Sequence, residues 1–361
     1  MSRDGPLLSI SDLHTYFDTD EGTVRAVDGV SFDVDRGETV ALVGESGSGK
    51  TVTGESITRL FRSPPGYIPE GSVRFDGREV TDMSEDELRA LRGGRVSHVF
   101  QNPQGALNPV YTVGWQLREA IELHQDVGGE EARDRAVELL SRVGIPEAGT
   151  RLDDYPHEFS GGQKQRVVVA IALACEPDLL IADEPTTALD VTIQAQILRL
   201  FANLQRERDM AVLFITHDLG VVAEVADRVV VLYAGKVMER GAVEDIFETP
   251  AHPYTRALLD CLPGEGSRAG ISGEIPDPTD PPDGCRFADR CEYDRGECHE
   301  GDQPPLYGLD GDGHVVSCVH FAPGGDPDIV TEDGRRTDAP ATARTERTGP
   351  GDDESAGGDR R

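Results

Sequence analysis

The chain has 361 residues, a net charge of −32 at pH 7 and an isoelectric point near 4.5. This length is enough for two or three compact units and a sizeable core. So acidic a surface argues against nonspecific binding to nucleic acid, because contacts with phosphates need cations.

The basic residues are almost all arginine, since only Lys50, Lys164 and Lys236 are lysines. Strong acidity with so little lysine resembles proteins of extreme halophiles, in which salt screens the self-repulsion. A GC-rich genome that replaces lysine with arginine is the alternative, but it does not explain the excess of acidic residues. We therefore hypothesise that the fold requires salt.

The apolar stretches are too short for a membrane span. The longest, Val167 to Cys175, falls well below the roughly 20 residues that a bilayer needs. The N-terminal residues Met1 to Asp4 open no signal peptide. We therefore expect a cytosolic chain whose cysteines are reduced.

Short apolar stretches at 7–10, 24–27, 30–34 and 39–43 predict strands. Between the first two lie Tyr16 and Phe17. An aromatic side chain upstream of a nucleotide site could stack on adenine, although ordinary core packing is the simpler explanation for this pair.

The strand at 39–43 leads into the pattern G-x-x-x-x-G-K-[ST], and a helix is expected after it. The glycines let backbone N–H groups approach phosphate oxygens, and the helix N-terminus adds positive charge. Lysine here reaches the β- and γ-phosphates and threonine holds Mg²⁺. A glycine-rich turn that binds nothing is the alternative. The residues expected to bind nucleotide are Gly44, Glu45, Ser46, Gly47, Ser48, Gly49, Lys50 and Thr51.

Further strands are predicted at 72–75 and 95–100, and Gln101 opens a polar break after the second. The apolar spacing then becomes helical, with helices around 113–121 and 132–143. Gly144 ends the second of these helices. Residues 110–158 are therefore expected to form a helical insert.

Beyond the insert, polar motifs alternate with apolar segments. Ser160 suits an N-cap before the helix at 167–174, and Gly161, Gly162 and Gln163 complete an exposed anion site at its start. The buried strand at 179–183 presents two carboxylates at its carboxyl end. Those carboxylates are Asp183 and Glu184, with Asp190 soon after and His217 at the end of the next strand.

This order of motifs resembles the nucleotide-binding subunits of ABC transporters over residues 7–260, with Phe159 where leucine is usual. The segments 100–109 and 252–259 are similar to those of oligopeptide and dipeptide importers. The resemblance implies an α/β phosphate-loop NTPase core with an N-terminal antiparallel β subdomain and a helical insert. It also implies that two cassettes close head to tail around ATP and Mg²⁺.

The resemblance assigns a role to each remaining motif residue. Glu184 would act as general base, and Asp183, with Thr51 and Gln101, would hold Mg²⁺. His217 would bridge the γ-phosphate and Glu184, while Asp190 would shape the dimer contact. Phe17, with Tyr16 beside it, would stack on adenine.

A second unit is expected at 261–322, and a disordered acidic tail at 323–361. The cysteines of this unit are spaced C-x5-C-x6-C-x19-C, and the segment 284–291 resembles the extension of peptide-importer ATPases that holds a [4Fe-4S] cluster. Zinc is the rival ligand, and free thiols are a third possibility. The expected ligands are Cys285, Cys291, Cys298 and Cys318, whereas Cys175 and Cys261 are expected to be packed thiols.

The function implied is ATP hydrolysis that powers import of di- or oligopeptides, at the cytoplasmic face of the membrane. The implied partners are a second ATPase subunit in a heterodimer, two membrane permease subunits and, through them, an extracellular substrate-binding protein. The alternatives are another cargo such as nickel or sugar, a soluble ABC ATPase acting on ribosomes or DNA, and a redox-sensing module.

Overall fold

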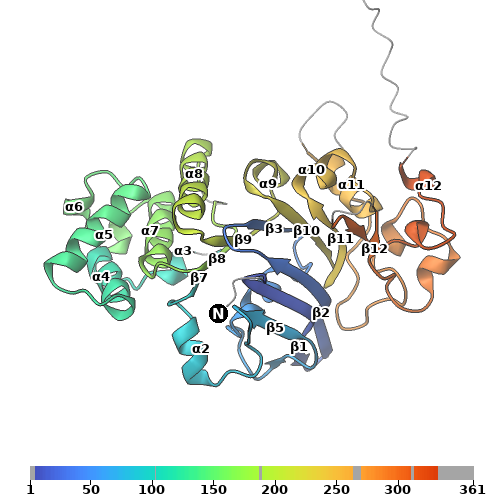
Figure 1. Cartoon of the computed structure of the whole chain (residues 1–361), viewed down its shortest axis with the longest axis horizontal. Coiled ribbons are helices and arrows are strands. Elements are labelled where there is room, and N and C mark those ends of the chain that lie inside the picture. The colour runs from blue at the N-terminus through green and yellow to red at the C-terminus, as the bar shows by residue number, and fades with distance from the viewer. Residues whose placement is uncertain (1–4, 102, 187–188, 263–269, 310–312, 332–361) are drawn as a thin grey trace, which may run out of the picture.

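The structure is a computed structural model that describes residues 5–101, 103–186, 189–262, 270–309 and 313–331. Two β-sheets form its centre, with a helical insert at one end and the C-terminal extension at the other (Figure 1). The smaller sheet has the order β2-β1-β5-β6, and β4 pairs with β1. Its strands are β1 Leu8–Thr19, β2 Gly22–Val34, β4 Gly66–Tyr67, β5 Ser72–Phe75 and β6 Arg78–Glu79.

The N-terminal strands differ from the prediction of several short strands. β1 and β2 are long, antiparallel and interrupted by β-bulges. Their pairing continues through polar residues, because one face of an antiparallel sheet can be solvated. Tyr16 and Phe17 therefore lie within β1.

The larger sheet has the order β12-β13-β11-β10-β3-β9-β8-β7 and is parallel from β10 to β7. Every residue of β3, β8 and β9 is buried, as expected for a parallel sheet covered on both faces. The strands are β3 Thr39–Val43, β7 Val96–Val99, β8 Leu179–Asp183, β9 Ala211–Thr216, β10 Arg228–Tyr233, β11 Lys236–Ala242, β12 Tyr307–Gly308 and β13 Val315–Val316.

The predicted helical insert is present and packs on the left of the larger sheet in Figure 1. Gly144 adopts a left-handed conformation (φ 75°) just after the second predicted helix, which confirms the expected stop. The helices up to residue 208, inside and outside the insert, are α1 Lys50–Ile57, α2 Glu85–Leu91, α3 Pro103–Ala106, α4 Val113–His124, α5 Glu130–Arg142, α6 Ala148–Arg151, the 3-10 turn Pro156–Glu158, α7 Gly161–Ala174 and α8 Val191–Arg208.

The C-terminal extension continues the larger sheet, because β13 pairs with β11 and β12 with β13. Ordered structure also reaches past 323, where the tail was expected to begin: Asp328–Thr331 form the helix α12, Val330 is buried, and the Arg256 guanidinium donates to the Val330 carbonyl. The remaining helices are α9 Leu219–Val225, α10 Val243–Glu248, α11 Pro253–Asp260, α12 Asp328–Thr331 and the 3-10 turns Ala288–Arg290, Gly296–His299 and Val319–Phe321.

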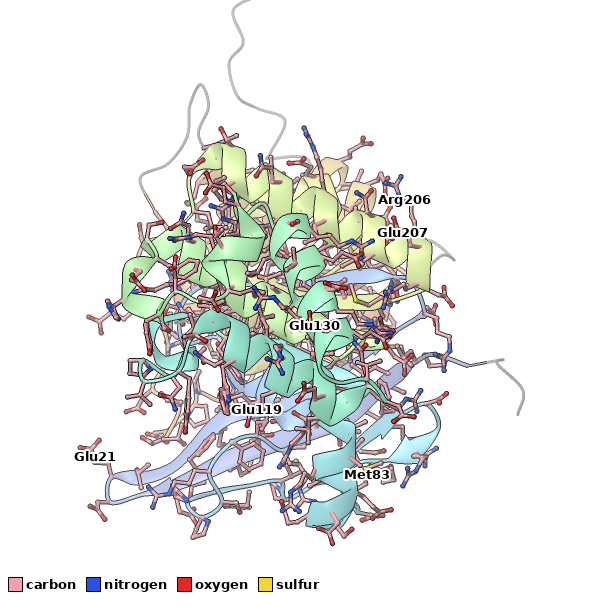
Figure 2. All side chains as sticks on the ribbon, turned by 90° about the vertical axis from the view of Figure 1, so that its left-hand side faces the viewer. Glu21, Met83, Glu119, Glu130, Arg206 and Glu207 are labelled. Carbon is pink, nitrogen blue, oxygen red and sulfur yellow. The ribbon has the colours of Figure 1, made fainter. Side chains whose placement is uncertain are left out.

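Four apolar clusters form the core of the described part of the chain, the smallest of them around Ala251, Val316 and Cys318. Of the other three, one joins the larger sheet to the helical insert, one fills the space between the two sheets, and one lies beneath the extension. Acidic side chains such as Glu21, Glu119, Glu130 and Glu207 are exposed on the outside (Figure 2). No helix in the described ranges is long and apolar enough to cross a membrane.

Candidate functional site

The predicted phosphate loop joins β3 to α1. Gly44 (φ 151°) and Gly49 (φ 99°) adopt conformations that favour glycine. A Cβ on Gly44 would lie 2.1 Å from the Leu232 carbonyl oxygen, and one on Gly49 would lie 2.3 Å from that of Ala26. Other side chains are therefore excluded at both positions, and the loop lies tightly against the strands around it.

The Lys50 ammonium group lies inside this loop. Its Nζ donates to the carbonyl oxygens of Gly44 at 2.8 Å and Glu45 at 2.7 Å, and contacts Ser48 Oγ at 3.2 Å. Burial lowers the pKa of Lys50, opposed by the nearby carboxylates of Glu184 and Asp183. The lysine is thus held where the loop would surround phosphate groups.

Thr51 and Asp183 meet across the end of β8, where Thr51 Oγ1 donates to Asp183 Oδ2 at 2.7 Å. Burial raises the pKa of Asp183, and the charge of Glu184 adds to that rise. A hydroxyl and a carboxylate oxygen side by side are the hard oxygen donors that Mg²⁺ prefers. These two residues therefore fit the predicted magnesium site.

Glu184 connects the other two predicted catalytic side chains. Its Oε2 accepts from Gln101 Nε2 at 3.0 Å, and its Oε1 lies 2.8 Å from His217 Nδ1. The backbone of Glu184 has φ 46°, a left-handed conformation that a non-glycine residue rarely adopts. Such strain is typical of functional sites. Here the strained residue contacts Gln101 and His217, each of which follows the end of a different strand.

The Ser-Gly-Gly-Gln motif forms the start of α7, as predicted. Ser160 Oγ accepts from the backbone of Gln163, and the Gln163 side chain accepts from the backbone of Ser160, a reciprocal capping box. Ser160 and Gly161 are exposed. None of the hydrogen bonds or ion pairs among the described residues joins this motif to the phosphate loop.

Asp190 caps α8 by accepting a hydrogen bond from the Ile193 backbone N–H at 3.1 Å. Asp190 itself is exposed. Phe17 is half-buried, with its ring edge-on to Phe61 at 5.9 Å. The contacts of Tyr16 differ, since its hydroxyl donates to Asp28. Phe17 therefore packs against another aromatic ring, whereas Tyr16 contacts a carboxylate.

Sequence reasoning assigned no role to Tyr254 or Arg290, yet both contact Glu45 of the phosphate loop. The Glu45 backbone N–H donates to Tyr254 Oη at 2.8 Å, and the Arg290 guanidinium donates twice to the Glu45 carboxylate. Both residues lie in segments, 252–259 and 284–291, that resemble those of peptide-importer ATPases. Nothing in their spacing indicates which part of the cassette they touch.

The four extension cysteines lie in one neighbourhood. Burial raises the pKa of Cys285 to about 11 and that of Cys291 and Cys318 to about 12, and the neighbouring thiols add to each rise. However, no group of three or more His, Cys, Asp or Glu side chains in the described part of the chain is arranged to hold a metal ion. The donor set thus suits a soft metal centre, but the side chains do not stand in a ligating arrangement.

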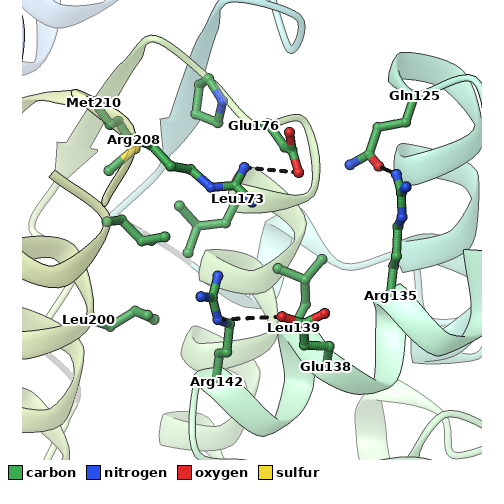
Figure 3. A pocket seen from close by; sticks show the side chains of 12 residues that line it. Gln125, Arg135, Glu138, Leu139, Arg142, Leu173, Glu176, Leu200, Arg208 and Met210 are labelled. Atoms are coloured by element: carbon green, nitrogen blue, oxygen red, sulfur yellow. Dashed lines mark hydrogen bonds and ion pairs between the residues drawn. The ribbon is translucent and has the colours of Figure 1, made fainter. Parts of the chain in front are cut away.

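A cavity of about 190 Å³ lies apart from these motifs, between α5, α7 and α8 (Figure 3). Leu139, Leu173 and Leu200 form its apolar wall. Arg208 pairs with Glu176 at 2.9 Å at its rim. None of its lining residues belongs to a nucleotide motif, so we assign it no part in the site.

Known proteins similar to this chain include the same nucleotide-binding family that the site geometry indicates. Residues 27–187 match the family model described as "ABC transporter", and residues 238–298 match "Oligopeptide/dipeptide transporter, C-terminal region". The chain is 50% identical to the dipeptide transport ATP-binding protein DppD of Bacillus subtilis, over 86% of this chain and 94% of that protein. It is also 50% identical to the oligopeptide transport ATP-binding protein OppD of that organism, over 88% of this chain and 89% of that one.

Solved structures confirm the predicted fold of the cassette. The ATP-binding cassette MJ0796, seen as a dimer in a post-hydrolysis state with ADP and phosphate, superposes with a TM-score of 0.60 at 30% identity, covering 65% of this chain and 98% of that one. The motifs, their geometry and the relatives that are 50% identical over most of the chain all indicate the same family. The chain belongs to the ATP-binding subunits of ABC transporters, enzymes that hydrolyse ATP, and carries the C-terminal region of their oligopeptide/dipeptide type.

Proposed function

We propose that this chain hydrolyses ATP to power the uptake of di- and oligopeptides through separate membrane subunits. The contacts of Glu184 with Gln101 and His217, next to the Thr51–Asp183 pair, support the hydrolytic part. The peptide cargo is inferred from the transport functions named for the relatives and from the matched C-terminal region.

Within the site, each residue has a task in phosphoryl transfer. The phosphate loop and Lys50 would bind the β- and γ-phosphates, and Thr51 with Asp183 would hold Mg²⁺, which neutralises phosphate charge when bound. Glu184 accepts a proton from the attacking water. His217 and Gln101 orient the Glu184 carboxylate through the contacts described above, and Phe17 provides a stacking surface for adenine.

A second cassette completes the site in this proposal. Ser160 and Gly161, both exposed, and the half-buried Gly162 and Gln163 would form an anion site without a phosphate loop of their own, so they would bind the nucleotide of a partner. Asp190 lies exposed at the start of α8, where it would shape that contact. We propose a heterodimer with a related ATPase subunit.

The membrane subunits would bind near Gln101, at the cytoplasmic face of the membrane. Tyr111 and Trp115 stack on each other at 4.0 Å between ring centroids, and both are exposed. Exposed aromatic residues of this kind mark protein interaction sites. An extracellular substrate-binding protein would deliver peptides to the two permeases.

Co-purification from the native membrane tests this function. Two polytopic membrane proteins, with ATP-dependent uptake of radiolabelled tripeptide into vesicles, are the expected result. Uptake of nickel or sugar instead would replace the cargo and keep the ATPase. Ribosomal proteins in place of permeases would refute transport.

We also propose a [4Fe-4S] cluster on Cys285, Cys291, Cys298 and Cys318, based on the four-thiol donor set and on the likeness of the segment 284–291 to the extension that holds such a cluster. The thiols would have to move into a ligating arrangement to bind it. Its role would be to hold the small extension together. Assays of iron and acid-labile sulfide on anaerobically purified protein test it. Zinc without iron would favour the rival centre.

The salt requirement is a further proposal, supported by the net charge of −32. Repulsion among so many carboxylates destabilises the compact state unless salt screens it.

A further inference from the structure

The phosphate loop is held from outside the cassette by one arginine of the extension. The side chain of Arg290 is 3% exposed, and its Nη1 and Nη2 donate to the two carboxylate oxygens of Glu45 at 2.7 Å and 3.1 Å. This two-pronged geometry is the strongest and most directional form of a carboxylate–guanidinium pair.

The remaining donors of Arg290 are also used. Nε donates to the Ser272 carbonyl at 2.9 Å, Nη2 to the Ile271 carbonyl at 3.0 Å and Nη1 to Tyr233 Oη at 3.1 Å. A guanidinium group has five N–H donors, and all five have acceptors here. The position of the Glu45 carboxylate is therefore fixed relative to β10 and to the extension, and a lysine could not reproduce the fork.

Glu45 transmits this position to the nucleotide-binding lysine. Its backbone carbonyl accepts from Lys50 Nζ at 2.7 Å and from the Ser48 N–H at 3.2 Å, while its own N–H donates to Tyr254 Oη. The rings of Tyr233 and Tyr254 pack 4.7 Å apart. The side chain of Glu45 thus faces the extension, and its main chain faces the phosphate site.

A second arginine of the same short segment attaches the extension to the smaller sheet. Arg286 is buried and donates to Asp28, which also accepts from Tyr16 and lies 3.3 Å from Lys236 Nζ. Arg286 Nη1 donates in addition to the Ala234 carbonyl at 3.3 Å. The segment from 285 to 291 therefore has one anchor on β2 and another on the phosphate loop.

We propose that Arg290 is a positioning residue for the phosphate loop, through which the cysteine extension sets the ATP affinity of its own cassette. The consequence is a two-way coupling, since a contact that favours the nucleotide-binding form of the loop must also be favoured by the nucleotide. Disruption of the extension weakens ATP binding, and ATP binding tightens the extension.

Equilibrium binding of a fluorescent ATP analogue tests the first half. Arg290→Met is expected to weaken binding about tenfold, within the range of typical site-to-site couplings, and to raise KM while kcat at saturating ATP stays within about twofold. Arg290→Lys, which keeps the charge without the fork, should recover only part of the affinity. Arg295→Met is the matched control, because Arg295 pairs with Glu297 inside the extension at 3.1 Å, and it should bind ATP as the wild type does.

Glu45→Gln addresses the chance that Arg290→Met fails to fold, since it leaves the guanidinium bonded to Tyr233, Ile271 and Ser272. In a double-mutant cycle the two substitutions should be non-additive. Strict additivity, or binding within twofold of the wild type in both single variants, would overturn the proposal.

Hydrogen exchange tests the second half. Adding MgATP to the full chain should slow amide exchange in residues 284–291 of the wild type, and Arg290→Met should abolish that protection. Equal protection in both proteins would contradict the coupling.

Discussion

The Glu184 carboxylate lies 2.8 Å from Nδ1 of His217. The two residues directly follow adjacent parallel strands, β8 and β9, whose pairing sets Asp183 beside Ile215. Gln101 reaches the other carboxylate oxygen from the end of β7. Neighbouring strand ends therefore place the Glu184 carboxylate, the proton acceptor that we propose, between Gln101 and His217.

Replacing Glu184 with glutamine tests the role of that acceptor. We expect kcat to fall by about 10²-fold to 10⁴-fold, the range for a positioned proton acceptor, with ATP binding retained and a closed dimer trapped. Steady-state hydrolysis, equilibrium ATP binding and gel filtration with ATP measure these three effects. Glu224→Gln, an exposed change on α9, should behave as the wild type, and wild-type turnover in Glu184→Gln would remove Glu184 from its role.

Ser160, which caps α7, should affect both the stability of the fold and ATP-dependent dimerisation. Ser160→Ala removes an N-cap, which costs about 1 kcal/mol of stability, and it also removes a hydroxyl that we assign to the partner's nucleotide. Thr112→Ala is the matched control, because Thr112 caps α4 by accepting from the Trp115 N–H at 3.2 Å. Both variants should lose similar stability in chemical denaturation, and only Ser160→Ala should lose ATP-dependent dimerisation. Equal dimerisation in the two would contradict the role of Ser160.

The buried Asp28 predicts a pH dependence of stability. Burial alone would raise its pKa, but the hydrogen bond from Tyr16 and the charges of Lys236 and Arg286 lower the pKa from 3.8 to about 2. A lowered pKa in the folded state stabilises the fold at pH values above 3.8, and this contribution is lost as the pH falls toward 2. It amounts to roughly 2 kcal/mol.

Denaturant midpoints between pH 5 and pH 2 would show this effect. The loss of stability on acidification should be smaller in Asp28→Asn by that amount, whereas Asp280→Asn, at an exposed residue, should keep the wild-type slope. An unchanged slope in Asp28→Asn would mean that the pair with Arg286 contributes little.

Salt should stabilise the protein by screening. The Debye length falls from about 10 Å at 0.1 M salt to about 3 Å at 1 M, so the thermal midpoint should rise steeply over this range for a chain of charge −32. Sucrose at equal osmolality is the control, because it acts by exclusion from the surface and not by screening. Full stability at low ionic strength would contradict the salt requirement.

Much of the nucleotide site was predictable because each motif is contiguous and ends a strand or starts a helix. The apolar run before Asp183 predicted β8, and the glycines after β3 predicted the loop. The Ser160 N-cap and the stop at Gly144 are local signals that the structure confirms. Local chemistry determined these features.

Contacts between distant segments were not predictable in this way. Glu45 and Arg290 are 245 residues apart, and no periodicity indicates that their surfaces meet. The bulges that carry β1 through its polar residues were missed for a related reason, since the partner strand β2 satisfies the backbone there. The roles of the nucleotide-site residues, of Phe17 and Asp190, and of the cysteines stay predictions.

The pairing of β13 with β11 has a consequence for shortened forms of the chain. A protein ending after α11 would leave the backbone of β11 with an open edge, a template on which other molecules can add strands. It would also remove His314, whose Nε2 lies 2.8 Å from the fully buried Glu239 carboxylate. Such a cassette is expected to precipitate when expressed alone, even though every nucleotide motif would still be intact.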